Sequence, residues 1–317
     1  MRLSLLMENN NAQIRGGAAA KEDYLIRATA ADDAVRAFAV TTRGVTEEAR
    51  RRHGLSPVAS AALGRTMAAA LMMGADLKND TDVLTIRFTG DGPIGAITVT
   101  ADAKGGVKGY VDHPDVILPP NAQGKFDVGT AVGHGELHIM KDLGLKEPYA
   151  GTVAIQTGEI AEDISYYFAV SEQVPSVVSL GVLCNTADYS IRESGGFMLQ
   201  LLPFCPDEVI EKLEERCRSL PSATDMLRQG MSPEEILSFV LEGMDPVVRD
   251  KKPVRFRCDC SRERVEKAII AMGAKEIRSL IADGKPVTLN CGFCNTDYMF
   301  SIDDLITLLG RAQRTPS

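Results

Sequence analysis

Four cysteines near the C-terminus constrain this chain more than any other feature. Cys258 and Cys260 form a Cys-x-Cys pair, Cys291 and Cys294 form a Cys-x-x-Cys pair, and thirty residues separate the pairs. Two close cysteine pairs around a helix-sized insert are typical of a metal site, because each pair can place two sulfurs on one ion. The sequence therefore predicts that all four thiolates bind Zn²⁺, with Gly292 allowing a tight turn in the second pair.

The segment from Arg255 to the C-terminus is too short to bury enough apolar surface to fold alone. Metal binding would then contribute much of its folding free energy. Four arginines surround the first pair in sequence, and their charge favours the thiolate form: Arg255, Arg257, Arg262 and Arg264.

The Cys-x-Cys pair is less usual, since ordinary zinc ribbons use two Cys-x-x-Cys pairs. A disulfide between Cys258 and Cys260 would close a small, strained ring. Strained disulfides are more oxidising and more easily reduced. The pair therefore suits a switch, although a static zinc ribbon that only holds the tail together has the same spacing.

This order of cysteines, together with upstream motifs, resembles the heat shock protein 33 family of bacterial redox-regulated holdase chaperones, also called 33 kDa chaperonins. The resemblance covers nearly the whole chain after about residue 21. The upstream motifs are Asp23-Tyr24-Leu25-Ile26-Arg27-Ala28, Arg51-Arg52-His53-Gly54-Leu55-Ser56-Pro57, Ser171-Glu172-Gln173-Val174-Pro175-Ser176 and Gly195-Gly196-Phe197-Met198-Leu199-Gln200-Leu201-Leu202-Pro203.

The resemblance implies a non-enzymatic chaperone whose four thiolates hold Zn²⁺ when reduced. On oxidation the metal leaves and disulfides Cys258–Cys260 and Cys291–Cys294 are expected. The tail and the linker before it then lose order and expose apolar surface that holds unfolding client proteins. The family forms homodimers when active. No ATP-binding motif is apparent in the sequence, which fits a holdase.

The apolar runs of the sequence indicate where the protein is expected to act. No apolar run approaches the roughly 18 residues of a membrane helix, and the apolar start is too short for a signal peptide. We therefore expect a cytoplasmic protein, where clustered cysteines indicate metal or redox chemistry. The isolated Cys184, Cys205 and Cys217 are interpreted as small buried hydrophobic residues.

The net charge of −8 argues against a general nucleic-acid binder. The charge is uneven, because residues 249–267 carry +4 and the rest of the chain −12. A basic tail docked on an acidic body is therefore expected.

Periodicity predicts an α+β fold with helices packed on antiparallel sheet. We predict a mobile arm at residues 1–21, an α+β core at 22–220, a helical linker at 221–254 and a zinc-binding domain at 255–317. Ser56 and Pro57 begin a helix that is apolar nearly all round and therefore buried. Strands are expected at 24–30, 35–42, 83–89, 95–102, 107–111, 134–140, 149–157, 174–183 and 197–202.

The linker contains a capping box, Ser232-Pro233-Glu234-Glu235, which begins a short helix. Its apolar face is expected to pack on the body: Ile236, Leu237, Phe239, Val240 and Leu241. A charged link is expected after Asp245-Pro246. In the tail, helices are predicted at 261–271 and 274–282, and a strand at 287–290.

Other chemistries have weaker support. His134-Gly135-Glu136-Leu137-His138 lacks the spacing and the helix of a metalloprotease motif. Cys291-Gly292-Phe293-Cys294 without a surrounding βαβ unit does not favour a thiol–disulfide oxidoreductase. The basic residues near Cys258 leave a zinc ribbon that binds nucleic acid or ribosomes as another alternative.

Overall fold

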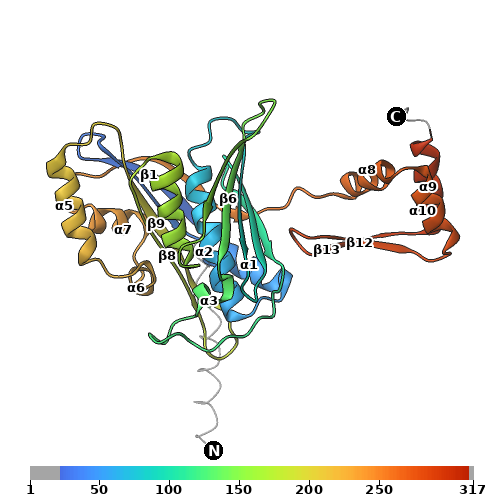
Figure 1. Ribbon diagram of the computed structural model, residues 1–317, viewed down its shortest axis with the longest axis horizontal. Helices are drawn as coiled ribbons and strands as arrows, with labels where there is room; N and C mark the ends of the chain where they lie inside the picture. Colours follow the sequence, from blue (N-terminus) through green and yellow to red (C-terminus); the bar gives the residue numbers. More distant parts are fainter. Residues whose placement is uncertain (1–21, 314–317) are drawn as a thin grey trace, which may run out of the picture.

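Two sheets, antiparallel except for one strand pair, form the framework of the chain before residue 257 (Figure 1). The computed structural model describes residues 22–313. The five-stranded sheet has the order β10 (Val247–Pro253), β1 (Tyr24–Ala30), β2 (Val35–Thr41), β9 (Ile191–Leu201) and β8 (Ser176–Cys184). The six-stranded sheet has the order β11 (Arg255–Phe256), β5 (Gly106–Val111), β4 (Ala96–Asp102), β3 (Val83–Gly90), β6 (Gly135–Asp142) and β7 (Tyr149–Ala154). Only β11 and β5 pair in parallel among these strands, so the predicted α+β class is confirmed.

Helix α2 (Pro57–Gly74) packs against strands of both sheets. The Ser56 side chain accepts a hydrogen bond from the Ala59 amide, as the capping signal predicts. Nearly every residue of the helix is buried, and small residues let the sheets approach closely. A Cβ on Gly64 would lie 2.7 Å from the Thr46 side chain. The remaining helical segments of this part are α1 (Arg43–His53), α3 (Val128–Val132), α4 (Ile160–Tyr167) and the π-helical turn η1 (Phe168–Glu172).

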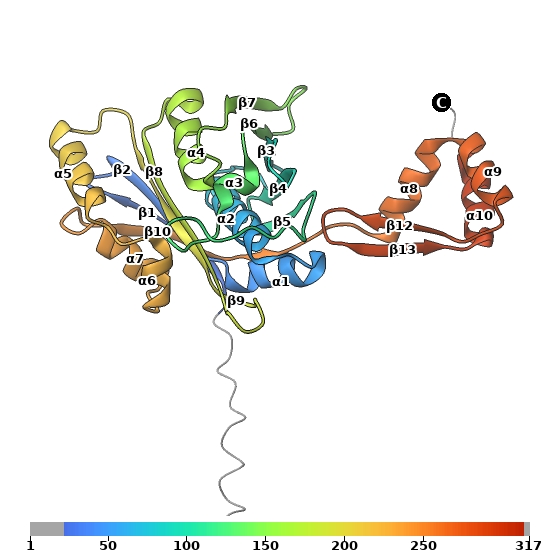
Figure 2. The same cartoon turned by 60° about the horizontal axis from the view of Figure 1, so that its bottom comes forward.

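Three helices cover the outer face of the five-stranded sheet (Figure 2). They are α5 (Asp207–Arg218), α6 (Ala223–Arg228) and α7 (Pro233–Val240). Ile236 and Val240 of α7 are fully buried and share an apolar cluster with Ile26 and Phe197 of the sheet. Burying such a side chain contributes roughly 1.5–3 kcal/mol. The predicted capping box at Ser232 is present.

Two features of the segment after α6 differ from the prediction. The expected charged link is strand β10, which pairs with β1. An edge strand is held by backbone hydrogen bonds and needs no buried apolar face, so its charged sequence carries no strand signal. The second difference is Phe239, which is 38% exposed and lies against the Arg216 guanidinium of α5 instead of joining the apolar cluster between α7 and the sheet.

After β11 the chain leaves the sheets and forms a small separate cluster of elements (Figure 1). We call residues 22–257 the body and residues 258–313 the tail. The tail contains α8 (Arg262–Met272), α9 (Ala274–Ala282), β12 (Val287–Cys291), β13 (Thr296–Phe300) and α10 (Ile302–Ala312). Helices α8 and α9 and strand β12 are as predicted, whereas β13 and α10 are additions.

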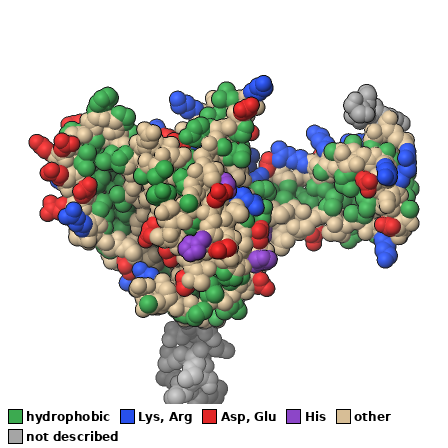
Figure 3. All heavy atoms as spheres, viewed as in Figure 1, with side chains coloured by type: hydrophobic (Ala, Val, Ile, Leu, Met, Phe, Trp, Pro, Cys, Tyr) green, Lys and Arg blue, Asp and Glu red, His purple; other side chains and the backbone are tan. Residues whose placement is uncertain are grey.

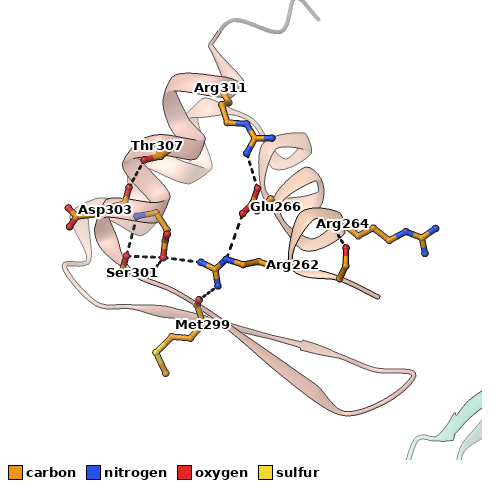
Figure 4. Close-up of polar contacts among 10 residues, drawn as sticks. Arg262, Arg264, Glu266, Met299, Ser301, Asp303, Thr307 and Arg311 are labelled. Atoms are coloured by element: carbon orange, nitrogen blue, oxygen red, sulfur yellow. Dashed lines mark hydrogen bonds and ion pairs between the residues drawn. The ribbon is translucent and has the colours of Figure 1, made fainter. Parts of the chain in front are cut away.

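Arg262 ties together three elements of the tail (Figure 4). Its Nη1 donates to the Met299 carbonyl at 2.7 Å, and its Nη2 lies 3.0 Å from Asp304 at the start of α10. It also faces Glu266, which pairs with Arg311 at 2.8 Å. Such exposed pairs contribute little each, typically 0–1 kcal/mol, so they orient α8 and α10 more than they stabilise them.

The remaining expectations concern histidines, membranes and the N-terminus. His138 lies on strand β6, whereas a metalloprotease motif needs a helix. Its Nδ1 is 3.0 Å from Thr152 Oγ1. Within residues 22–313 no helix has the length and apolarity to cross a membrane. The arm predicted at residues 1–21 lies outside the described residues.

Candidate metal centre

The structure brings all four predicted cysteines together where the tail meets the body. Cys258 and Cys260 follow β11, Cys291 ends β12, and Cys294 lies in the turn before β13. The four sulfurs lie within 4.8 Å of one another. Cys258 Sγ is 3.8 Å from Cys291 Sγ, and Cys260 Sγ is 3.3 Å from Cys294 Sγ.

This arrangement fits a tetrahedral ion. Metal–sulfur bonds of about 2.3 Å separate the sulfurs of a tetrahedral zinc site by roughly 3.8 Å. Each of these two sulfur–sulfur distances joins a cysteine of the first pair to a cysteine of the second. One ion at the centre would therefore bind both pairs. Soft thiolate ligands favour Zn²⁺ among the common divalent ions.

Electrostatics also favours a bound cation. Burial raises the pKa of Cys258 and of Cys291. Burial acts the same way on Cys294, but hydrogen bonds with Thr296 and Cys260 outweigh it and lower its pKa to about 7. Only one thiolate is therefore favoured near neutral pH without a metal. Four adjacent negative sulfurs would repel one another, so the remaining thiols would ionise only as they bind a cation.

Side chains of β13 contact two of the sulfurs. The Tyr298 hydroxyl donates to Cys260 Sγ at 3.1 Å, and this hydrogen bond raises the pKa of Tyr298 to about 12. The Cys294 thiol lies 3.3 Å from Thr296 Oγ1. Hydrogen bonds of this kind orient ligands and tune a metal site.

The expectation that four nearby arginines favour the thiolate form of the first pair is not met at Cys258, because burial raises its pKa. Arg264 pairs with Asp259, and so does Lys108 of the body. The hydrogen bond from Lys108 is the main cause that holds the pKa of Asp259 at about 2. Arg262 points instead to the carboxylates of α8 and α10 (Figure 4). The Lys108–Asp259 pair also reverses the expected polarity, since here the body is the basic partner.

The turn of the second pair relies on Asn295 instead of Gly292. Asn295 has a left-handed backbone with φ of 55°, and its amide donates to the Cys291 carbonyl at 2.7 Å. A Cβ on Gly292 would meet nothing within 4 Å. The turn joins two strands of a hairpin, which is not the strand-to-helix junction of a thioredoxin-like pair.

The three other cysteines lie outside the cluster. Cys184 is buried in β8, as expected, and burial raises its pKa to about 11, which makes it a poor nucleophile. Cys205 and Cys217 are only partly buried.

Sequence patterns do not indicate which body residues lie beside the second pair. Arg52 and His53 at the end of α1, and Lys108 and Tyr110 of β5, contact the turn that carries Cys294. Arg52 and His53 belong to a motif that supports the family resemblance, but the motif alone does not reveal a contact with the tail.

Fold and site define an α+β protein with a C-terminal four-cysteine cluster suited to a metal. The model of the Hsp33 protein family matches residues 23–301. The 33 kDa chaperonin of Lachnoclostridium phytofermentans is 51% identical over 290 residues, which cover 92% of this chain and 99% of that relative. The 33 kDa chaperonin of Clostridioides difficile is 50% identical over 288 residues, covering 90% and 98%.

A solved structure agrees. The crystal structure of the 33 kDa chaperonin from Thermotoga maritima matches with a TM-score of 0.86 and 36% identity, covering 93% of this chain and 99% of that one. The chain belongs to the Hsp33 family of chaperones.

Proposed function

We propose that this chaperone is an ATP-independent holdase that is switched by oxidation of Cys258, Cys260, Cys291 and Cys294. The observation that carries the proposal is the cluster of four sulfurs at the point where the tail joins the body. In the reduced state the four thiolates hold Zn²⁺, which cross-links the two pairs and keeps the tail folded.

The switch is a two-electron oxidation of each pair by a peroxide. A thiolate attacks one peroxide oxygen, the other oxygen leaves as hydroxide or water, and a sulfenic acid forms. The second thiolate attacks that sulfur, hydroxide leaves, and the disulfide forms. The family resemblance supports Cys258–Cys260 and Cys291–Cys294 as the products. Sulfurs bonded to each other no longer act as thiolate ligands, so the metal is released.

Loss of tail order then reaches the linker. Strand β10 leads through residues 254–257 directly into the first cysteine pair. Helix α7 has only eight residues, and isolated helices of that length are marginal in water. When the packing of α7 on the sheet weakens, exposed apolar surface becomes available to bind unfolding clients. The fully buried side chains of α7 and of the residue after it are Ile236, Leu237, Val240 and Leu241.

The same proposal covers partners and location. The partners are unfolding proteins and, in the oxidised state, a second copy of the chain, as the family resemblance implies. The protein acts in the reducing cytoplasm and catalyses no reaction of its own.

The test measures zinc content and suppression of client aggregation on the same samples, before and after peroxide. We expect one zinc per reduced chain with little suppression, and zinc loss with strong suppression after oxidation. Peptide mapping follows the disulfides. Suppression that is equally strong in the reduced, zinc-loaded protein would refute the redox switch.

A further inference from the structure

The turn that carries the second cysteine pair is docked on the body. We call residues 291–295 the knuckle. The Phe293 ring packs edge-on against Tyr110, with centroids 5.3 Å apart and an interplanar angle of 83°. Lys108 Nζ lies 5.1 Å from the centre of the same ring. Phe293 is not part of the apolar cluster of the tail, so its ring packs on the body instead.

The backbone of the knuckle is bound as well. His53 Nε2 lies 3.2 Å from the Phe293 carbonyl oxygen, and Arg52 Nη1 donates to the Cys294 carbonyl at 3.4 Å. In return the Asn295 side chain donates to the Arg52 carbonyl at 2.7 Å. The Phe293 and Cys294 carbonyls both face the end of α1 because the knuckle forms a tight turn. The same turn positions Cys291 and Cys294.

These contacts come from fixed elements of the body. Arg52 and His53 end helix α1, and Lys108 and Tyr110 lie on strand β5. Strand β11, which leads to the first cysteine pair, runs parallel to β5. We call Arg52, His53, Lys108 and Tyr110 the knuckle receptor.

We propose that the knuckle receptor lets the body sense directly whether the four cysteines hold a metal. The metal fixes the shape of the knuckle, and the receptor binds that shape. This inference rests on the proposed metal site. Coupling between two binding events is reciprocal, so docking on the receptor must tighten metal binding by the same factor as the metal tightens docking.

The test changes the receptor and measures the metal. Zn²⁺ affinity of the reduced full-length protein is determined by competition with a chromophoric chelator. Tyr110→Ala removes the ring that packs on Phe293 and leaves all four cysteines in place, and we expect roughly 5- to 150-fold weaker Zn²⁺ binding, the usual range of such coupling. Phe293→Ala should act in the same direction.

Two variants serve as controls. Tyr110→Phe keeps the ring and should keep the wild-type affinity, which separates loss of the contact from damage to β5. Tyr149→Ala removes an exposed tyrosine of β7 that also lies near a lysine, and it should leave the affinity unchanged. Amide exchange at residues 50–53 should accelerate when a chelator removes Zn²⁺ from the wild type.

The outcomes separate this inference from the proposed function. A reduced wild type that binds no Zn²⁺ would overturn both. If the wild type binds Zn²⁺ and Tyr110→Ala binds it equally tightly, the inference alone is overturned.

Discussion

Body and tail are stabilised in different ways. The body encloses large apolar clusters that include fully buried Phe38, Leu63, Met67 and Phe88. The tail buries few apolar side chains: Ile269, Ile277, Phe300, Leu305 and Leu308. Because small units bury too little surface to fold alone, the proposed function makes the tail depend on the metal and on its contacts with the body. Under that proposal, oxidation of the four sulfurs would unfold the tail and leave the sheets of the body folded.

The body and the tail can also be told apart on the molecular surface (Figure 3). The tail projects from one side of the body and carries several Lys and Arg side chains on its visible face. Linker helix α7 belongs with the body by burial, although its eight residues make it shorter than the tail helices α8, α9 and α10, which have eleven, nine and eleven. Variants of α7 can therefore test whether burial against the body controls the stability of this helix.

The largest effect is expected from Cys294→Ser. Loss of one ligand should release the metal, and structural zinc sites in small peptides contribute about 10–16 kcal/mol of apparent binding free energy. Amides of α8, α9 and α10 should lose protection from hydrogen exchange, whereas those of α2 and the sheets should keep theirs. Cys205→Ser, which changes a cysteine outside the cluster, should change neither set. Retained protection in the tail would show that its small apolar cluster suffices.

The next effect concerns the linker. Ile236→Ala opens a cavity beneath α7, where Ile236 is fully buried, and large-to-small changes of this kind cost about 2–5 kcal/mol. We expect faster amide exchange in α7 and suppression of client aggregation, followed by light scattering, without any oxidant.

Phe239→Ala is the matched control for that variant. Its ring is exposed and contacts Arg216, and such a cation–π contact contributes about 0.5–1 kcal/mol at an exposed site. Reduced Phe239→Ala should therefore behave nearly as wild type. Equal chaperone activity in the two variants would mean that burial of α7 does not control the switch.

A smaller effect compares the two capping boxes. Ser232→Ala at α7 and Ser301→Ala at α10 should each cost about 1 kcal/mol of local helix stability, seen as faster amide exchange in the first turn. After zinc removal the Ser301→Ala effect should disappear, because α10 is then already unfolded. Thr307→Ala, inside α10, is the control. A persistent Ser301→Ala effect in the zinc-free protein would contradict dependence of the tail on metal.

The smallest effect is on pH. Burial lowers the pKa of His53 despite its contact with the Phe293 carbonyl. A histidine whose folded-state pKa is depressed stabilises the docked form above its ordinary pKa of about 6.5, and this contribution is lost as pH falls below that value. At saturating Zn²⁺, the protection factors of the knuckle amides, which correct for slower intrinsic exchange at lower pH, should therefore fall more between pH 7.5 and 5.5 in wild type than in His53→Gln. Parallel pH profiles would exclude this role.

Local signals allowed much of the architecture to be predicted. Ser56 and Ser232 cap helices through amides three residues away, and that chemistry requires no distant partner. The spacing of Cys258, Cys260, Cys291 and Cys294 likewise indicated a cluster that the structure contains. Ser301 with Asp304 is a signal of the same kind, and it could have revealed α10.

Other features depended on residues far apart in the chain. The charged residues of β10 become a strand because β1 offers backbone partners, and backbone pairing leaves no mark in the side-chain pattern. The apolar pattern of the linker helix predicts that Phe239 is buried, but the orientation of α7 on the sheet turns its side chain outward.

The cysteine spacing by itself determined that this protein would carry a metal-type cluster, because ligand geometry is set within a few residues. Only the tertiary structure decided that the cluster lies against the body. That position depends on Arg52, His53, Lys108 and Tyr110, which the folds of α1 and β5 bring to a turn that lies far away in sequence.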